Sequence, residues 1–293
     1  MRIKESIGSR IFDCFNYLFM LLFAIITLVP FLNLITMSFS APEVASQLGL
    51  HLFPTEFHFD SYQKVFEADY IWKGFANSIL ITVAGTLMTV LVSVLAAYPL
   101  SKKYLMHRGF WTGIIVFTMF FTGGMIPNYI LIRNLGLIDN RLSLILPSLV
   151  NTFNMLIVRN FYMSLPDSIE ESAKIDGAND IQILFRIVIP LSMSIIATVA
   201  LWTAVALWNS WFPCLLYIRD TDKYVLQVVL RRIILEGSSE FINFEATSGT
   251  TIEPAAESIK AATVIVTILP IMCVYPFLQK YFVKGVMVGS LKG

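Results

Sequence analysis

Charged residues are scarce in this sequence, and their scarcity excludes a broad class of proteins. Asp, Glu, Lys and Arg make up 14% of the 293 residues, whereas they make up about 25% of an ordinary soluble domain. Apolar residues make up 56% of the chain, and the mean hydropathy is +0.72. A soluble chain of this length could not bury so much apolar surface, so the composition predicts an integral membrane protein. No nucleic-acid partner is expected.

The sequence also lacks the motifs of several kinds of chemistry. It has no G-x-x-x-x-G-K-[ST] run, so the chain is not expected to bind and hydrolyse ATP through a P-loop. Its cysteines, Cys14, Cys214 and Cys273, lie far apart and lack the spacing of metal ligands. No paired acid and no nucleophile–base set is present, which disfavours a membrane-embedded enzyme. We therefore expect no catalytic residue, no metal ligand and no cofactor bound by this chain.

Six apolar runs are long enough to cross a membrane as helices. A helix needs roughly 20 residues to cross about 30 Å of hydrocarbon, and it pairs its backbone polar groups within itself. The runs are Phe15–Met37, Phe75–Pro99, Trp111–Ile132, Leu142–Phe161, Met193–Tyr217 and Ala261–Phe282. The first run is longer than the apolar core of a signal peptide, so we expect it to remain in the protein as an uncleaved first helix. The fold class predicted is an all-α membrane protein with six transmembrane helices, in which residues 1–14 precede a single transmembrane domain, residues 15–293.

Carboxylates are absent from all six runs. Ion-coupled secondary transporters usually keep ionisable groups on their pathway, although such groups are costly in hydrocarbon. The energy for any transport is therefore expected to come from outside this chain. An ion-coupled secondary transporter stays as the alternative class.

The distribution of basic residues predicts the orientation, because Lys and Arg accumulate in cytoplasmic loops. With the N-terminus inside, the inner segments carry a net charge of +5 and the outer segments −4. Lys102, Lys103 and Arg108 weigh most, since they lie in the short segment between the second and third runs. Arg133 and Arg141 in a short outer loop are a mild counter-signal. We expect both termini in the cytoplasm.

A polar loop, residues 162–192, separates the fourth and fifth runs on the inner side. Asp167 and Glu170 suit the positive N-terminal end of a short helix, and Gly177 suits its C-terminal stop. A second helix is expected over Asp180–Ile189, ending where Pro190 removes a backbone donor. The loop is thus predicted to form two short helices joined at a glycine, a compact knob on the membrane surface.

This loop resembles the E-A-A, three residues, Gly, nine residues, I-x-L-P motif of binding-protein-dependent ABC importer permeases. Five positions match in register: Glu171, Ala173, Gly177, Ile187 and Pro190. Ser172 replaces the middle Ala of the motif, and Ile189 replaces its Leu. The resemblance implies that the loop, called the coupling loop below, docks on an ATPase subunit. The coupling residues that it implies are Glu170, Glu171, Ser172, Ala173, Asp176 and Gly177.

The resemblance covers almost the whole chain and extends to the carbohydrate branch of these permeases. Asn77-Ser78, Trp208-Asn209 and the C-terminal residues 279–293 look like that branch. Gly123–Pro127 and Trp208–Pro213 resemble the subgroup that handles oligo- and polysaccharides, including lipo-oligosaccharide, rhamnogalacturonan and alginate importers. The chain is therefore expected to be a permease subunit of a sugar importer in a bacterial cytoplasmic (inner) membrane, embedded in lipid.

The family also implies partners and a cofactor outside this chain. The expected partners are a second, related permease that forms a heterodimer with this one, two ATPase subunits and an extracytoplasmic solute-binding protein. ATP-Mg would be bound by the ATPase subunits alone. Alternating access would follow when ATP closes the ATPase dimer and the coupling loop moves with it.

The outer loop over residues 218–260 is the second place where a function could be encoded. Long polar loops in compact proteins are usually either functional or disordered. In the maltose importer's G-type permease, which this chain resembles, the equivalent loop reaches into the solute-binding protein. By that similarity the contact candidates are Gly237, Ser238, Ser239 and Thr250. A mobile loop without a partner is the alternative.

Aromatic and amide side chains in the spans suggest a substrate path. Aromatic faces stack on sugar rings and an amide binds hydroxyls, which makes Trp208 and Asn209 candidates. Trp202 and Trp211 are better explained as packing or interface anchors. Tyr129 is a third candidate, because the Gly123–Tyr129 segment interrupts its span and could form either a kink or a gate lining a cavity.

Overall fold

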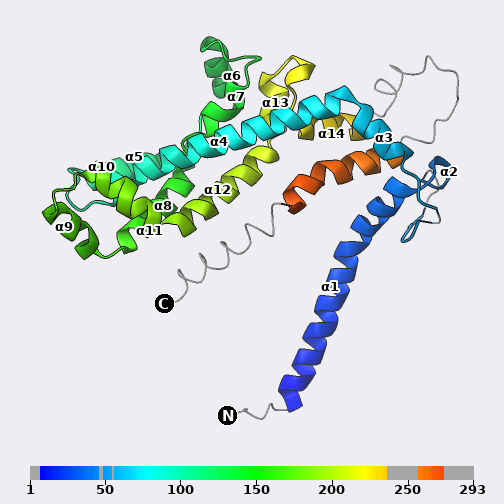
Figure 1. Ribbon diagram of the computed structural model, residues 1–293, viewed down its shortest axis with the longest axis horizontal. Helices are drawn as coiled ribbons and strands as arrows, with labels where there is room; N and C mark the ends of the chain where they lie inside the picture. Colours follow the sequence, from blue (N-terminus) through cyan, green and yellow to red (C-terminus); the bar gives the residue numbers. More distant parts are fainter. Residues whose placement is uncertain (1–6, 46–48, 55, 236–256, 274–293) are drawn as a thin grey trace. The chain divides into compact units, whose positions relative to one another are not determined.

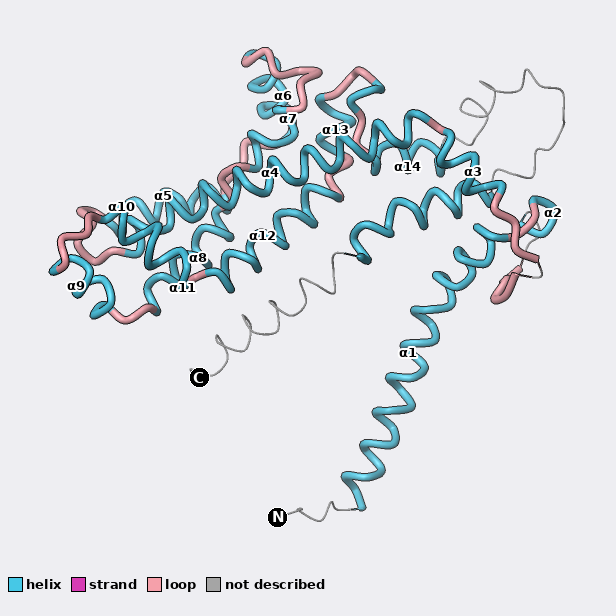
Figure 2. Tube along the Cα trace, viewed as in Figure 1, coloured by secondary structure: helices cyan, strands magenta, loops and turns pink. Residues whose placement is uncertain are grey.

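The computed structural model describes residues 7–45, 49–54, 56–235 and 257–273, and within these ranges it contains helices and loops but no strand (Figures 1 and 2). The all-α prediction is confirmed. The chain divides into two compact units, Met1–Asp69 with Leu230–Ile268, and Tyr70–Val229 with Leu269–Gly293.

The first unit contains three helices before α4. They are α1 (Ile7–Phe39), α2 (Pro42–Ala45) and α3 (Asp60–Glu67). The end of α1 packs on α3 through the ring of Phe39, which lies 4.9 Å from the ring of Tyr62, while Ser38 Oγ shares a 2.8 Å hydrogen bond with the Tyr62 hydroxyl. Val65 of α3 is 1% exposed, so the apolar face of this amphipathic helix is the buried one. Residues 257–273, of which the first twelve belong to this unit, are also helical.

The second unit is built around α4 (Asp69–Ser101), which runs unbroken for 33 residues. The helices that follow are α5 (Arg108–Phe120), α6 (Met125–Asn134), α7 (Leu142–Ile145), the 3₁₀ turn η1 (Leu146–Ser148), α8 (Thr152–Ser164), α9 (Asp167–Ile175), α10 (Asp180–Ile183), the π-helical turn η2 (Leu184–Val188), α11 (Ile189–Leu191), α12 (Met193–Trp208), α13 (Phe212–Tyr217), the 3₁₀ turn η3 (Thr221–Lys223) and α14 (Leu226–Leu235). Helix α14 continues from this unit into the first.

The hydrophobic core of the second unit lies where α4, α8 and α12 meet the coupling loop. Side chains from all three helices are buried there, and Ala173 and Ile183 of the coupling loop are buried with them. The members of this cluster, called the loop core below, are Val94, Ala97, Tyr98, Leu100, Met155, Val158, Tyr162, Ala173, Ile183, Leu184, Val188 and Val199. The coupling loop is therefore part of the fold and not an appendage.

Two described helices, α1 and α4, are long and apolar enough to cross a membrane, and up to five spans result if each bent pair counts as one. The three bent pairs are α5 with α6 at 108°, α7–η1 with α8 at 48°, and α10–α11 with α12 at 79°. The structure thus supports a membrane protein with several spans, and the number six stays a prediction. Residues 274–282 of the sixth predicted run lie outside the described residues.

Local chemistry explains why three apolar runs are interrupted. Gly124 has φ +86° and stands before α6, a conformation that L-residues rarely adopt. Asn151 caps α8 by accepting the N–H of Asn154 at 3.0 Å. The fifth run stops as a helix at Trp208 and resumes at Phe212, where Pro213 fills the first turn of α13. Hydropathy measures how long such apolar runs are, but it does not detect the breaks before α6, α8 and α13.

One helix boundary in the coupling loop was predicted wrongly. The second helix was expected to end at Ile189, before Pro190, but the helical path from Asp180 continues to Leu191. The path widens into the π-helical turn η2, and Pro190 then sits in the first turn of α11, where its missing N–H is tolerated. The change of direction falls at Ser192, whose N–H is bonded to the carbonyls of Val188 and Ile189 at 3.0 Å each.

Candidate functional site

The first helix of the coupling loop, α9, is closed at its C-terminus by a Schellman motif. Gly177 has φ +81°, and its N–H donates to the carbonyl of Lys174 at 3.0 Å. The N–H of Ala178 donates to the carbonyl of Ala173 at 2.9 Å. Both bonds satisfy carbonyls that the end of a helix leaves unpaired. The predicted glycine stop is confirmed in this geometry.

The second helix begins two residues later with a capping box. The side chain of Asn179 accepts the N–H of Gln182 at 2.8 Å, and the side chain of Gln182 accepts the N–H of Asn179 at 3.0 Å. The turn between α9 and α10 is therefore held by backbone and side-chain bonds on both sides. The two helices are joined as one knob.

The coupling loop has a buried face and an exposed face. Ala173 is 8% exposed and Ile183 is fully buried, and both belong to the loop core. Glu171, Asp176 and Gly177 are exposed, as is Ser172, which donates a 2.9 Å hydrogen bond to the carbonyl of Ser168 within α9. Three isoleucines are also exposed: Ile169, Ile175 and Ile181, at 36%, 87% and 70%. An exposed face with apolar and acidic residues side by side is the kind of surface that a protein partner covers.

Glu170 behaves differently from Glu171 beside it, because it is paired inside the protein. Its carboxylate forms an ion pair with the ammonium of Lys102, and the side chains of Lys102 and Glu170 are only 10% and 17% exposed. The ammonium of Lys102 also lies 4.2 Å from the centre of the Tyr98 ring. The structure therefore places Glu170 on the anchored side of α9.

A second ion pair at the start of α9 is open to solvent. Lys103 Nζ lies 2.8 Å from Asp167 Oδ2, with side chains 81% and 72% exposed. The hydrogen bond from Lys103 lowers the pKa of Asp167 below its ordinary value. Two adjacent lysines thus contact the same helix, Lys102 through a largely buried ion pair and Lys103 through an exposed one.

Sequence reasoning missed Lys102 as a partner of the coupling loop. It counted Lys102 and Lys103 together as charges that set orientation, since the pattern of a short basic segment does not distinguish them. The contact spans 68 residues of sequence between Lys102 and Glu170, which no local motif reports.

A cleft of about 520 Å³ lies between α4, α7, α8, α12 and α13. Hydroxyl and amide groups and three aromatic rings, those of Phe153, Trp202 and Tyr217, line it, and no charged side chain is among its lining residues. Its polar lining is Thr89, Ser143, Ser148, Asn151, Asn154, Thr203, Ser210 and Tyr217. Asn154 Nδ2 donates to Thr203 Oγ1 at 3.1 Å, which ties α8 to α12 beneath the cleft.

None of the three predicted substrate-path residues is among the lining residues of this cleft, although Trp208 and Asn209 lie between lining residues in the sequence. Trp208 is 7% exposed and meets the ring of Phe75 edge to face at 6.0 Å. Asn209 caps the end of α12, and its amide donates to the carbonyl of Val205 at 2.9 Å. Tyr129 stacks on Tyr217, which does line the cleft, with ring centres 6.3 Å apart. Trp202, which the sequence assigned to packing or interface anchoring, lines the cleft and lies 5.9 Å from the ring of Phe153.

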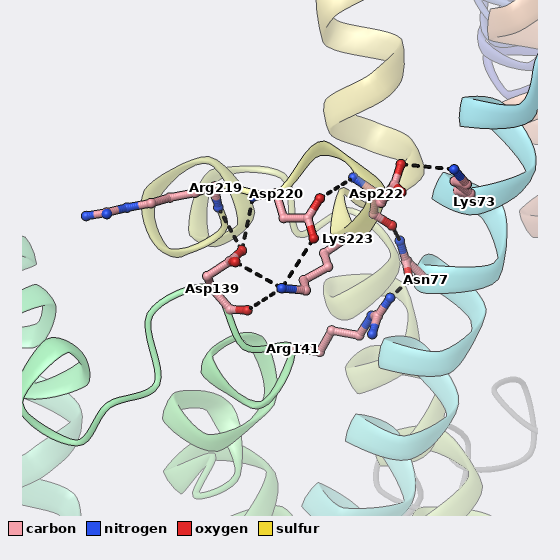
Figure 3. Close-up of polar contacts among 8 residues, drawn as sticks. All are labelled: Lys73, Asn77, Asp139, Arg141, Arg219, Asp220, Asp222 and Lys223. Carbon is pink, nitrogen blue, oxygen red and sulfur yellow. Dashed lines mark hydrogen bonds and ion pairs between the residues drawn. The ribbon is translucent and has the colours of Figure 1, made fainter.

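A polar cluster, shown in Figure 3, joins the loop after α6 to the segment after α13. Asp139 stands at its centre in a left-handed conformation, φ +60°. Its Oδ1 accepts the N–H groups of Arg219 and Asp220 at 3.1 and 3.0 Å, and its Oδ2 lies 2.9 Å from Lys223 Nζ. The bonds from the Asp220 N–H, Lys223 and the Arg219 N–H lower the pKa of Asp139 to about 2. We call these residues the Asp139 cluster.

The same segment is bound to the first turns of α4 (Figure 3). Asn77 Nδ2 donates to the carbonyls of Asp222 and Tyr224 at 2.8 and 3.0 Å, and Asn77 Oδ1 accepts Arg141 Nε at 2.9 Å. Lys73 Nζ lies 3.0 Å from Asp222 Oδ1. Both amide hydrogens and the carbonyl oxygen of the Asn77 side chain thus have protein partners, which explains how this amide is buried at 5% exposure.

The predicted binding-protein contacts, Gly237, Ser238, Ser239 and Thr250, lie outside the described residues. Among the residues that are described, no group of His, Cys, Asp and Glu side chains could hold a metal ion.

Comparison with known proteins identifies relatives over the full length. Residues 89–288 match the family described as "Binding-protein-dependent transport system inner membrane component". The chain is 42% identical over 285 residues to the polygalacturonan/rhamnogalacturonan transport system permease protein YtcP of Bacillus subtilis (strain 168), covering 97% of this chain and 99% of that protein. It is also 42% identical over 289 residues to the protein LplC of the same organism, covering 98% and 96%.

A solved structure is similar as well. A chain in the crystal structure of a bacterial ABC transporter involved in the import of the acidic polysaccharide alginate is 35% identical, with a TM-score of 0.89. The match covers 96% of this chain and 99% of that one.

Proposed function

The chain belongs to the family of binding-protein-dependent transport system inner membrane components, and on this premise we propose that it imports an oligosaccharide as one of two permease subunits of an ABC importer. The protein is a sugar ABC transporter permease, a transport component rather than an enzyme. The proposal concerns its partners, its coupling residues and its substrate.

The observation that carries the coupling proposal is the two-sided construction of the coupling loop. One side is packed into the loop core through Ala173 and Ile183, and the other side exposes Glu171 and Asp176. A knob fixed in this way moves with the helices beneath it, so a partner that holds the exposed side can move the spans. We propose that this partner is an ATPase subunit, with Glu171 as its acceptor and Gly177 shaping the turn. Glu170 and Ala173 would then hold the coupling loop to the spans, through the ion pair with Lys102 and through the loop core.

The remaining partners follow from the same premise. We propose a heterodimer with a second, related permease, two ATPase subunits that bind ATP-Mg, and an extracytoplasmic solute-binding protein that contacts residues 237–250. The chain would cross the bacterial inner membrane six times with both termini in the cytoplasm, and would bind no cofactor itself. The two long apolar helices and the three bent pairs support several spans.

The substrate we propose is an oligosaccharide that carries carboxylates. The 42% identical relative is named for polygalacturonan and rhamnogalacturonan transport, and the 35% identical structure is of an alginate importer. The cleft of this chain, in contrast, presents hydroxyls, amides and aromatic rings without a lining charge. It could therefore bind the hydroxyls and ring faces of a sugar unit. Recognition of the carboxylates would fall to the binding protein and the partner permease.

The test is substrate-stimulated ATP hydrolysis by the complete complex in lipid. The permease pair, the ATPase subunits and the binding protein would be assayed with oligogalacturonides, with alginate oligosaccharides and with neutral maltotriose. We expect stimulation by one of the acidic series and none by maltotriose. Stimulation by maltotriose alone would refute the acidic substrate while keeping the importer, and proton- or sodium-driven uptake without ATP would refute the importer.

A further inference from the structure

Helix α4 is fastened by polar side-chain contacts at both of its ends, and the two ends serve different functional regions. At its C-terminal end, Lys102 follows the last helical residue and forms a largely buried ion pair with Glu170 of the coupling loop. The carbonyl of Leu100 also accepts Arg159 Nε at 3.0 Å, which ties this end to α8. The end of α4 is therefore held by the same loop that faces the proposed ATPase.

The N-terminal end of α4 is fastened to the segment that leads into the long polar loop. Asn77 donates to the carbonyls of Asp222 and Tyr224, and Ser78 Oγ accepts the N–H of Leu226 at 2.8 Å (Figure 3 shows the Asn77 contact). Gly74 allows the backbones to approach closely, because a Cβ added there would lie 3.3 Å from Leu226 Cα. The segment fastened here continues through α14 toward residues 236–256.

Between these ends, α4 is one uninterrupted helix. The stretch from Asn77 to Lys102 spans about 37 Å at about 1.5 Å per residue. At Gly85, the middle residue of α4, the helix packs closely on α12, since a Cβ there would meet Leu207 Cδ1 at 2.6 Å. Its one interior proline, Pro99, lies in the last turn, so the backbone hydrogen bond that this residue cannot donate is missing only close to the Lys102 end. A displacement at one end of the helix is therefore expected to reach the other end.

We propose that α4 carries movement between the coupling loop and the segment at residues 222–226, with Lys102 and Asn77 as the positioning residues that connect it. In this arrangement the state of the ATPase is communicated to the face that receives the binding protein through a single helix of this chain. Neither residue needs to touch ATP or sugar. The inference rests on the proposed function, because it assigns a route between the two partners named there.

The experiment measures how strongly the loaded binding protein stimulates ATP hydrolysis by the complete complex in lipid. Two variants release one end each, Lys102→Met at the coupling loop and Asn77→Ala at the other end. We expect each to reduce the stimulation ratio at least 5-fold while the unstimulated rate and the complex yield stay near wild type. Exchange of the charges, Lys102→Glu with Glu170→Lys, should restore part of the ratio.

The decisive measurement is the double variant. If α4 carries the movement, releasing either end already interrupts it. The stimulation ratio of the double variant, Lys102→Met with Asn77→Ala, should therefore be no lower than that of the more severe single variant. Independent sites so far apart would instead multiply their losses. Multiplied losses, or full stimulation in either single variant, would overturn the proposal.

Matched controls separate this route from general damage. Lys103→Met removes the adjacent, exposed lysine, and Thr86→Val removes a hydroxyl from the middle of α4 that has no hydrogen-bond partner among the described residues. Both should keep the wild-type ratio. Should Asn77→Ala lower the yield, Ser78→Ala, which removes only the acceptor of the Leu226 N–H, replaces it. If the wild-type complex shows no stimulation by the loaded binding protein, the proposed function fails. If the wild-type complex is stimulated and the Lys102→Met and Asn77→Ala complexes are stimulated equally, only the helical route fails.

Discussion

At the scale of single residues, two left-handed positions shape the candidate sites for different reasons. Gly177 has no neighbouring atom within 4 Å of an added Cβ, so only its backbone conformation demands glycine. Asp139 has φ +60° with a side chain, and that side chain makes the contacts that hold it there. Aspartate tolerates this region better than most residues because its short carboxylate bonds locally.

Replacement of Gly177 tests the backbone requirement of the coupling loop. Gly177→Val should uncouple ATP hydrolysis from transport, because a β-branched residue with φ +81° costs about 1–2 kcal/mol or more and the turn would change. Gly177→Asn is the control, since Asn is accepted at this helix-end position. The measurement is sugar transported per ATP hydrolysed. Wild-type coupling in Gly177→Val would show that the turn conformation is dispensable.

The Asp139 cluster predicts a dependence on pH. The pKa of Asp139 is lowered from 3.8 to about 2, so its stabilising effect is complete above about pH 4 and is lost as the pH falls toward 2. Hydrogen exchange at the N–H groups of Arg219 and Asp220 should therefore stay slow at pH 5 and become faster, relative to intrinsic rates, near pH 2. Asp139→Asn keeps the tolerance for positive φ but loses the ion pair with Lys223, and it should exchange faster already at pH 5. Equal protection in both proteins at pH 5 would contradict the assignment.

At the scale of elements, the coupling loop depends on which isoleucine faces the loop core. Ile183 is fully buried, whereas Ile181 of the same short helix is 70% exposed. Ile183→Ala should leave a cavity and destabilise the loop by about 2–5 kcal/mol, with faster protease cleavage in residues 162–192 of the purified permease pair. Ile181→Ala should leave that cleavage unchanged and weaken binding of the ATPase subunits. A reversed pattern would mean that the buried and exposed faces are assigned wrongly.

The helical elements were partly predictable from the sequence, and the failures have physical causes. The helical tendency of the apolar runs and the turn chemistry around Gly177 are local properties, and the structure bears out both within the described residues, although it breaks three of the runs. The bend before α6 falls in the segment Gly123–Tyr129, where the sequence predicted an interruption, whereas the continuation of the helix through Pro190 depends on the backbone geometry of neighbouring turns. The Lys102–Glu170 pair and the lining of the cleft depend on contacts between distant segments. No periodicity or motif encodes those contacts.

At the scale of the whole molecule, the arrangement in the membrane is the feature that most needs measurement. The apolar runs predict six spans, and the charge pattern predicts that the coupling loop lies inside and residues 237–250 outside, while the described residues support two spans and up to five. Orientation decides which partner can reach which loop, because an ATPase acts only from the cytoplasm. The two proposed docking regions must therefore lie on opposite sides.

Single cysteines placed in the two loops test this arrangement. In a background without Cys14, Cys214 and Cys273, Ser172→Cys and Ser239→Cys would be treated with a membrane-impermeant maleimide in right-side-out and in inverted vesicles. The coupling-loop cysteine should react only in inverted vesicles, because Ser172 is exposed on a loop that is predicted to lie inside, and added ATPase subunits should then protect it. The cysteine at position 239 should react only in right-side-out vesicles, and added binding protein should protect it. Labelling in permeabilised vesicles gives the maximum extent of reaction for each cysteine. Labelling of both cysteines from the same side would refute the six-span arrangement, because an even number of crossings would then separate the loops.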